Sequence, residues 1–356
     1  MKFITALQVF GAQIAENGAA RVATAPFKVI SSDGLNNIPI FSHCGTGCLG
    51  DIGKLDYSRM IPPADKRVMA WIDANANHHA PFVNEATSLK TQYGKHHGKT
   101  CLLVLCGPSA AGIAERIAPY RDHPDFKVAT LNLSSKAVPD CDYFCNFEQL
   151  IPRDYFEHLD PERTTLLTCP MAGNPPPHQG YLASKWGGRN VYYSYMGDMR
   201  QPTDPRWDSL PLLFSALHTG VAALQAIYHM GFSNVLLVGA DYSMANPSMD
   251  PRNPCAVLEA DWYFDGTKYQ ADGGNMGKSY YNGQPLALAK GIDGKTVALL
   301  PMLHKHMLCT AAAMEVMHEA GVNVRNCSGQ GILDYNTHNL EDSLAELLKP
   351  QLQEVA

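Results

Sequence analysis

The chain has 356 residues, of which 46% are hydrophobic and 17% charged, and its formal net charge is −6. A chain of this length can bury the core of one large domain or two modest ones. The negative charge and the lack of a Lys/Arg cluster argue against a nucleic-acid partner, because neutralising phosphates requires clustered basic side chains. No apolar run approaches the ~18 residues that span a membrane. The sequence therefore predicts a cytoplasmic protein without a membrane span.

The first part of the chain, residues 1–99, is rich in Gly, Asn and His. Its opening residues, up to Ile14, carry apolar side chains at helical spacing, and the rest is predicted to be irregular. Cys44 and Cys48 form a C-x-x-x-C motif beside His43, but no second pair stands at a matching distance. Free thiols in a reducing compartment are therefore expected here, and no metal site.

From Thr100 onward, strands alternate with helices. This alternation predicts an α/β fold with a Rossmann-like parallel sheet and helices on both faces. Residues 100–243 form the predicted nucleotide-binding core, and residues 301–356 complete it with a helix and a strand. Residues 244–300 show little periodicity, which is typical of a lid insertion. The expected strands cover residues 100–106, 126–134, 141–147, 164–170, 234–242 and 322–328, and the two long helices cover 215–231 and 304–321.

The stretch "LCGPSAAG" predicts a strand, a tight turn at residues 107–109 and a helix capped by Ser109. It is neither a phosphate-binding Gly-Lys-Ser/Thr loop nor a G-x-G-x-x-G fingerprint. Asn132, Asn146 and Asp241 stand at or near the ends of other predicted strands. Since ligands of such sheets bind outside the carboxyl ends of the strands, these residues and the turn predict a binding site on one rim.

Several blocks of the sequence occur in the order of a known superfamily. They are "LCGPSAAG", "LNLSSKAVPDCDYFCNFEQL", "HTGVAALQAIYHMGFSNVLLVGADYS", "DWYFDG" and "HKHMLCTAAAMEVMHEAGVNVRNCS". The chain resembles the family once catalogued as domain of unknown function 115, which includes archaeal 6-hydroxymethylpterin diphosphokinases. The same blocks are similar to those of flagellin-modifying motility accessory factors and of the family 42 bacterial sialyltransferases. The resemblance covers residues 101–328.

The resemblance to the sialyltransferases implies a metal-independent glycosyltransferase. Such an enzyme moves a sugar, for example a nonulosonic acid, from a CMP-sugar donor to a hydroxyl of a glycan, a protein or another acceptor. No cofactor is implied beyond that donor, and a homo-oligomer is compatible with the sequence. His304 matches the catalytic histidine, and histidine suits a general base near neutral pH. The implied donor-binding residues are Gly107, Pro108, Ser109, Asn132, Asn146, Thr219, Gly220 and Asp241, and the lid candidates are Tyr269, Tyr280 and Tyr281.

Two alternatives stay open. Cys106 stands where the sialyltransferases have Asn, which is closer to a pterin-type diphosphokinase that uses ATP and Mg²⁺. Asp261 and Asp265 could hold such an ion, although acidic residues of a solvated lid are the more common case. A non-catalytic nucleotide-binding protein is the third interpretation. His218 is interpreted as a packed or capping residue as readily as a site residue. His306 forms an H-x-H pair with His304, but such a pair without a nearby acidic partner is weak evidence for a metal site.

Overall fold

The computed structural model of the chain describes residues 12–14, 20–22, 66–196, 207, 210–213, 218–243, 262–264, 269–271, 287–299 and 301–348. Its centre is a seven-stranded sheet in the order β15-β10-β3-β4-β5-β6-β7, and every neighbouring pair is parallel. The predicted α/β, Rossmann-like sheet is confirmed. The strands are β3 (Thr100–Val104), β4 (Phe126–Leu131), β5 (Tyr143–Asn146), β6 (Thr165–Thr168), β7 (Val191–Tyr193), β10 (Asn234–Val238) and β15 (Asn323–Asn326).

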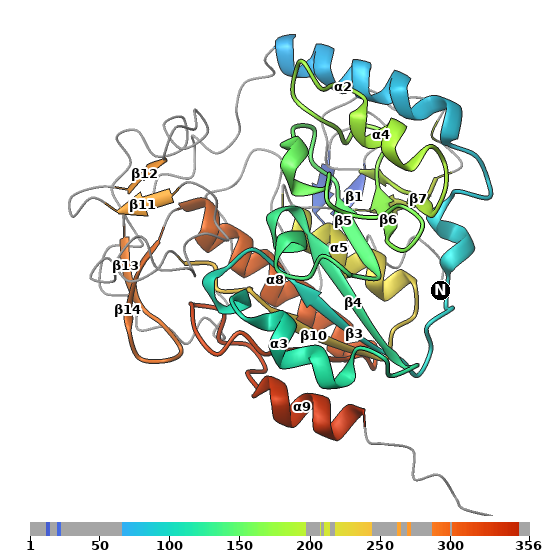
Figure 1. Ribbon diagram of the computed structural model, residues 1–356. Helices are drawn as coiled ribbons and strands as arrows, with labels where there is room; N and C mark the ends of the chain where they lie inside the picture. The colour runs from blue at the N-terminus through green and yellow to red at the C-terminus, as the bar shows by residue number, and fades with distance from the viewer. Residues whose placement is uncertain are drawn as a thin grey trace, which may run out of the picture.

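The strand order places a topological switch point between β3 and β10. From β3 the chain moves strand by strand to β7, and it then returns to the other side of β3 to add β10 and β15 (Figure 1). Parallel crossovers are right-handed, so helices that connect strands in opposite directions across the sheet lie on opposite faces. The described helices are α2 (Lys66–His79), α3 (Ile113–Ile117), α4 (Tyr181–Trp186), α5 (Thr219–His229), α8 (Pro301–Glu319) and α9 (Leu340–Leu347).

Helix α5 is the most completely enclosed of these helices. All of its residues, from Thr219 to His229, are buried. The helix contacts β4, β5 and α8, and its sequence is apolar around the whole circumference, as expected for a helix covered on every side. Because α5 runs from the rim of the sheet through the core, its first turn is held firmly at the carboxyl ends of the strands.

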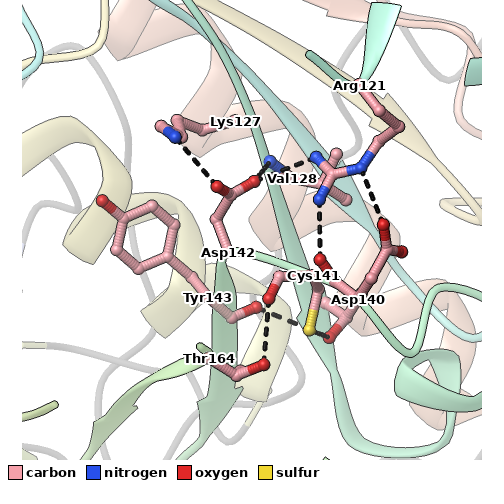
Figure 2. A network of polar contacts seen from close by, with 9 residues as sticks. Arg121, Lys127, Val128, Asp140, Cys141, Asp142, Tyr143 and Thr164 are labelled. Atoms are coloured by element: carbon pink, nitrogen blue, oxygen red, sulfur yellow. Dashed lines mark hydrogen bonds and ion pairs between the residues drawn. The ribbon is translucent and has the colours of Figure 1, made fainter. Parts of the chain in front are cut away.

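The amino-terminal edge of the sheet carries an ion-pair network, shown in Figure 2. Asp142 precedes β5 and accepts hydrogen bonds from Lys127 Nζ at 2.9 Å, Arg121 Nη1 at 3.0 Å and the backbone N–H of Val128 at 2.8 Å. Arg121 also binds Asp140. These contacts tie the start of β4 to the start of β5 at the edge opposite the predicted site, so their role is structural.

The region before residue 100 contains a helix that the sequence did not predict. Helix α2 contacts α4, and Asn75 Nδ2 donates to the carbonyl oxygens of Gln149 at 3.0 Å and Met171 at 3.3 Å. His79 contacts Tyr193 Oη and a backbone carbonyl, and burial lowers the pKa of its imidazole to about 4. This part of the chain therefore packs against the core, and describing all of residues 66–99 as irregular was wrong.

The other differences concern short strands. The opening helix was expected to run to Ile14, but residues 12–14 form strand β1 (Ala12–Ile14), which is antiparallel to β2 (Ala20–Val22). The earlier residues lie outside the described ranges. Within the predicted lid, the described residues form two antiparallel hairpins, and the remaining residues of the lid are not described, so the lid stays a prediction. The hairpins pair β11 (Trp262–Phe264) with β12 (Tyr269–Ala271) and β13 (Ala287–Lys290) with β14 (Thr296–Leu299), and a further short pair joins β8 (Tyr195–Met196) to β9 (Leu212–Leu213).

Candidate functional site

The turn at residues 107–109 follows β3 but does not begin a helix in the predicted way. Pro108–Ala110 form a 3₁₀ turn, and Gly112, at φ 67°, separates it from α3. Ser109 is not an N-cap. Its backbone N–H and its Oγ both donate to Asp241 Oδ2, at 2.9 and 3.0 Å, and the Gly239 N–H donates to Ser109 Oγ at 2.9 Å. The donors of Ser109 therefore bind the loop after β10.

Gly107 is required for the close approach of these two loops. Its N–H donates to the carbonyl oxygen of Gly239 at 2.9 Å. A Cβ at position 107 would lie 2.1 Å from Asp241 Oδ2 and 2.5 Å from the Gly239 carbonyl oxygen. Since neither group can move freely, only glycine fits here. Gly107, an implied donor-binding residue, thus allows a close approach of backbone to backbone in the structure.

Asp241 is a buried carboxyl at the switch point of the sheet. Its side chain is 1% exposed. Loss of hydration raises its pKa to about 7, and the hydrogen bonds from Ser109 oppose that rise. The group therefore titrates near neutral pH while it joins the loops after β3 and β10.

The predicted asparagines meet further along the same edge, in what we term the amide–carboxylate cluster: Asn132, Asn146, Glu148 and Thr219. Asn146 Nδ2 donates to Asn132 Oδ1 at 3.2 Å, and Asn132 Nδ2 donates to Glu148 Oε1 at 2.6 Å. Thr219 Oγ1 donates to the same Glu148 oxygen at 3.0 Å. Residues from the ends of β4 and β5 and from the start of α5 are thus joined by hydrogen bonds.

Each position of the cluster has a local cause. Asn132 has φ 50°, in the left-handed region that asparagine tolerates better than most residues. Asn146 is the last residue of β5 and is fully buried, and its Oδ1 has no hydrogen-bond partner. Loss of hydration raises the pKa of the Glu148 carboxyl, and the hydrogen bonds from Asn132 and Thr219 oppose this effect. Glu148 was missed because no motif marks a residue two positions beyond a strand.

A histidine pair lies beside the first turn of α5. His218 immediately precedes the helix, and its ring stacks on that of His306 with centroids 4.3 Å apart and an interplanar angle of 19°. Tyr242 contacts the edge of the His218 ring, and its hydroxyl lies 2.7 Å from Thr310 Oγ1. His306 is 8% exposed, so this pair packs α8 against the rim of the site.

The remaining predicted residues are placed only in part. His304 was expected as the first residue of the final helix, but α8 begins three residues earlier, at Pro301. Gly220 is buried in the first turn of α5, where a Cβ would lie 2.6 Å from the His218 ring. Tyr269 is the first residue of β12. Tyr280 and Tyr281 lie outside the described residues, as do Asp261, Asp265, His43, Cys44 and Cys48.

The comparisons with known proteins add no family. No protein-family model matches the chain, and the search of curated proteins found no similar sequence. Within the described ranges, no helix is both long enough and apolar enough to cross a membrane. In the same part of the chain, no three His, Cys, Asp or Glu side chains are grouped so that they could hold a metal ion.

Proposed function

We propose that the chain is a glycosyltransferase that moves a sugar from a nucleotide-activated donor to an acceptor hydroxyl. The donor class that the resemblance implies is a CMP-sugar, such as a CMP-linked nonulosonic acid, and no metal ion is required. One observation carries the proposal. Asn132, Asn146 and Thr219, which were selected from the sequence as donor-binding residues, come from three separate segments and join in one hydrogen-bonded cluster at the carboxyl edge of the sheet.

The location of the cluster supports a nucleotide ligand. Parallel α/β sheets bind nucleotides outside the carboxyl ends of their strands, and Asn132 and Asn146 mark the ends of β4 and β5. The first turn of α5, an eleven-residue helix, lies beside them. The resemblance assigns Thr219 and Gly220, the first two residues of this helix, to the donor.

The base that accepts the proton of the acceptor hydroxyl is assigned to His304. His306 is buried and stacked on His218, which gives it a packing role. The resemblance, which matches His304 to the catalytic histidine, gives His304 the chemical role.

A ligand screen by thermal shift tests the proposal. CMP, UDP, GDP and ATP are each added with and without Mg²⁺. A ligand at 100 times its Kd stabilises the native state by about 2.7 kcal/mol. We expect CMP to raise the melting temperature without Mg²⁺ and to lose most of this effect in Asn146→Ala. Asn77→Ala, which changes an exposed residue of α2, should respond like the wild type.

Binding is followed by a transfer assay with a CMP-sugar donor, in which released CMP is measured with and without chelator. Release that depends on an added acceptor and is insensitive to chelator supports the glycosyltransferase. Stabilisation by ATP with Mg²⁺ alone, together with activity that chelator abolishes and Mg²⁺ restores, would replace it with the diphosphokinase. Binding of CMP without any transfer would leave a nucleotide-binding protein.

A further inference from the structure

In the amide–carboxylate cluster, each hydrogen bond determines which atoms of the neighbouring side chain donate and which accept. Glu148 Oε1 accepts the hydrogen bond from Asn132, so Asn132 directs its NH₂ group toward Glu148. The carbonyl oxygen of Asn132 then faces the NH₂ group of Asn146. Thr219 also directs its hydroxyl proton toward Glu148. Glu148 therefore determines the orientation of both amides and of the hydroxyl.

With these orientations, two acceptor atoms of the cluster receive no hydrogen bond from the described residues. Both hydrogen bonds to Glu148 end on Oε1, and among the described residues Oε2 receives none. Asn146 Oδ1 is buried and has no partner. An unpaired buried acceptor is unfavourable, and only a donor group can satisfy it. The free capacity of the cluster is therefore for N–H or O–H groups.

We propose that Glu148 is the specificity-determining residue of the nucleotide site, and that with Asn146 it recognises hydrogen-bond donors of the nucleoside. The proposal rests on the function proposed above. Two parts of a cytidine nucleotide carry such donors: the ribose, with its vicinal hydroxyls, and the base, with its exocyclic amino group. A phosphate dianion carries only acceptors, so it offers no hydrogen-bond donor to Glu148 Oε2 or Asn146 Oδ1. Glu148 thus determines which end of the nucleotide lies over β4 and β5.

The test compares the binding of CMP, 2′-deoxyCMP and UMP by isothermal titration calorimetry. We expect one of the two analogues to bind wild-type protein about 10- to 100-fold more weakly than CMP, since hydrogen bonds to charged groups contribute on that scale. Weaker binding of 2′-deoxyCMP assigns the contact to the ribose, and weaker binding of UMP assigns it to the amino group. Equal binding of all three ligands would overturn the proposal.

Glu148→Gln is the decisive variant because it has nearly the same shape. Its amide oxygen can still accept from Asn132 and Thr219, whereas an NH₂ group replaces the free acceptor. We expect weaker CMP binding and a discrimination between CMP and the sensitive analogue below about threefold. Glu162→Gln is the matched control, because it removes an exposed carboxylate that pairs with Arg189 at the surface, and it should bind like the wild type.

The outcomes separate this proposal from the function on which it rests. If CMP binds the wild type and Glu148→Gln keeps both the affinity and the discrimination, Glu148 has no such role while the nucleotide site stands. If CMP does not bind the wild type, the proposed function and this subsite both fail. If Glu148→Gln does not fold, Glu148→Asp is tested in its place. It keeps the charge but shortens the side chain by one methylene, and wild-type affinity for CMP and both analogues would overturn the proposal.

Discussion

Asp241 makes the stability of the fold depend on pH in a way that can be calculated. The pKa of its carboxyl rises from an ordinary value of 3.8 to about 7 in the folded protein because burial removes its hydration. Below pH 4 the group is protonated in both the folded and the unfolded chain. Between pH 4 and 7 the unfolded chain loses the proton and the folded chain keeps it, so the free energy of unfolding falls as pH rises. Above pH 7 this contribution levels off.

The size of the effect follows from the two pKa values. At about 1.4 kcal/mol per pH unit, a rise from 3.8 to about 7 corresponds to about 4 kcal/mol of stability lost by pH 8. Asp241→Asn removes the titrating group, while its amide oxygen can still accept both hydrogen bonds from Ser109. We therefore expect the variant to gain stability relative to wild type as pH rises from 4 to 8.

Urea unfolding at pH 4, 5, 6, 7 and 8 measures the free energy of unfolding of the two proteins. In the difference between them, the contributions of the carboxyl groups that they share cancel. Asp154→Asn serves as a control, because Asp154 is an exposed partner of Lys136. Parallel stability curves for wild type and Asp241→Asn across this range would refute the reasoning. A change in the slope of the urea dependence would mean that the substitution altered the unfolded or native ensemble, and it would disqualify the comparison.

Four other expectations follow from the structure and the proposal. Gly107→Ala should lower the free energy of unfolding by at least about 1–3 kcal/mol in urea titrations, because its Cβ would overlap the loop after β10. His304→Ala should reduce turnover about 10²- to 10⁴-fold with little change in donor affinity, whereas His306→Ala should mainly lower the melting temperature; near-full activity of His304→Ala would remove the assigned base. Residues 244–300 should gain more protection from hydrogen exchange on CMP binding than any other segment, and equal protection in both states would argue against a lid. Asp142→Asn should destabilise the fold by about 1–3 kcal/mol in urea without changing CMP affinity, since its ion pairs lie at the opposite edge of the sheet.

The centre of the fold was predictable because β3 and β10 contain continuous apolar runs. Residues 102–105 and 235–238 are buried on both faces of a parallel sheet, and such burial requires an unbroken hydrophobic sequence. Helix α2 was not predicted because its sequence does not show a clear apolar pattern. Its sequence is rich in Asn and His, which usually indicate loops, but Asn75 and His79 are buried and bind backbone carbonyls of the core. Tertiary contacts therefore determine this helix more than local propensity does.

The proximity of the candidate residues was predictable, and their individual hydrogen-bond partners were less so. Strand ends in a parallel sheet meet at one edge, so Asn132 and Asn146 were expected to lie near each other, and they are hydrogen-bonded. Ser109 was interpreted from its neighbours as a helix cap, but its partner is Asp241, 132 positions away along the chain. Glu148 had no local signal at all. The spacing of residue types along the sequence does not reveal a contact between residues that are far apart in the chain.

The contacts of Asp241 also change where a ligand is expected. The general rule for parallel sheets places it at the switch point, here between β3 and β10. In this chain the loops after those two strands are joined to each other through Ser109, Gly107 and the Asp241 carboxyl. The donor groups of Gly107 and Ser109 are thereby used within the fold, and the free groups are acceptors: Asp241 Oδ1 in this crevice and, two strands further along at the end of β5, Asn146 Oδ1 beside the donors of the amide–carboxylate cluster. We therefore expect a nucleotide to make its polar contacts over β4 and β5 and to touch residues 107–109 by packing alone.

Labelling of Cys106 tests this placement, since Cys106 is partly exposed beside that turn and its Sγ lies 3.3 Å from the carbonyl oxygen of Leu131, at the end of β4. Bound CMP should protect Cys106 from alkylation in peptide-resolved mass spectrometry, and undiminished labelling at saturating CMP would place the nucleotide elsewhere.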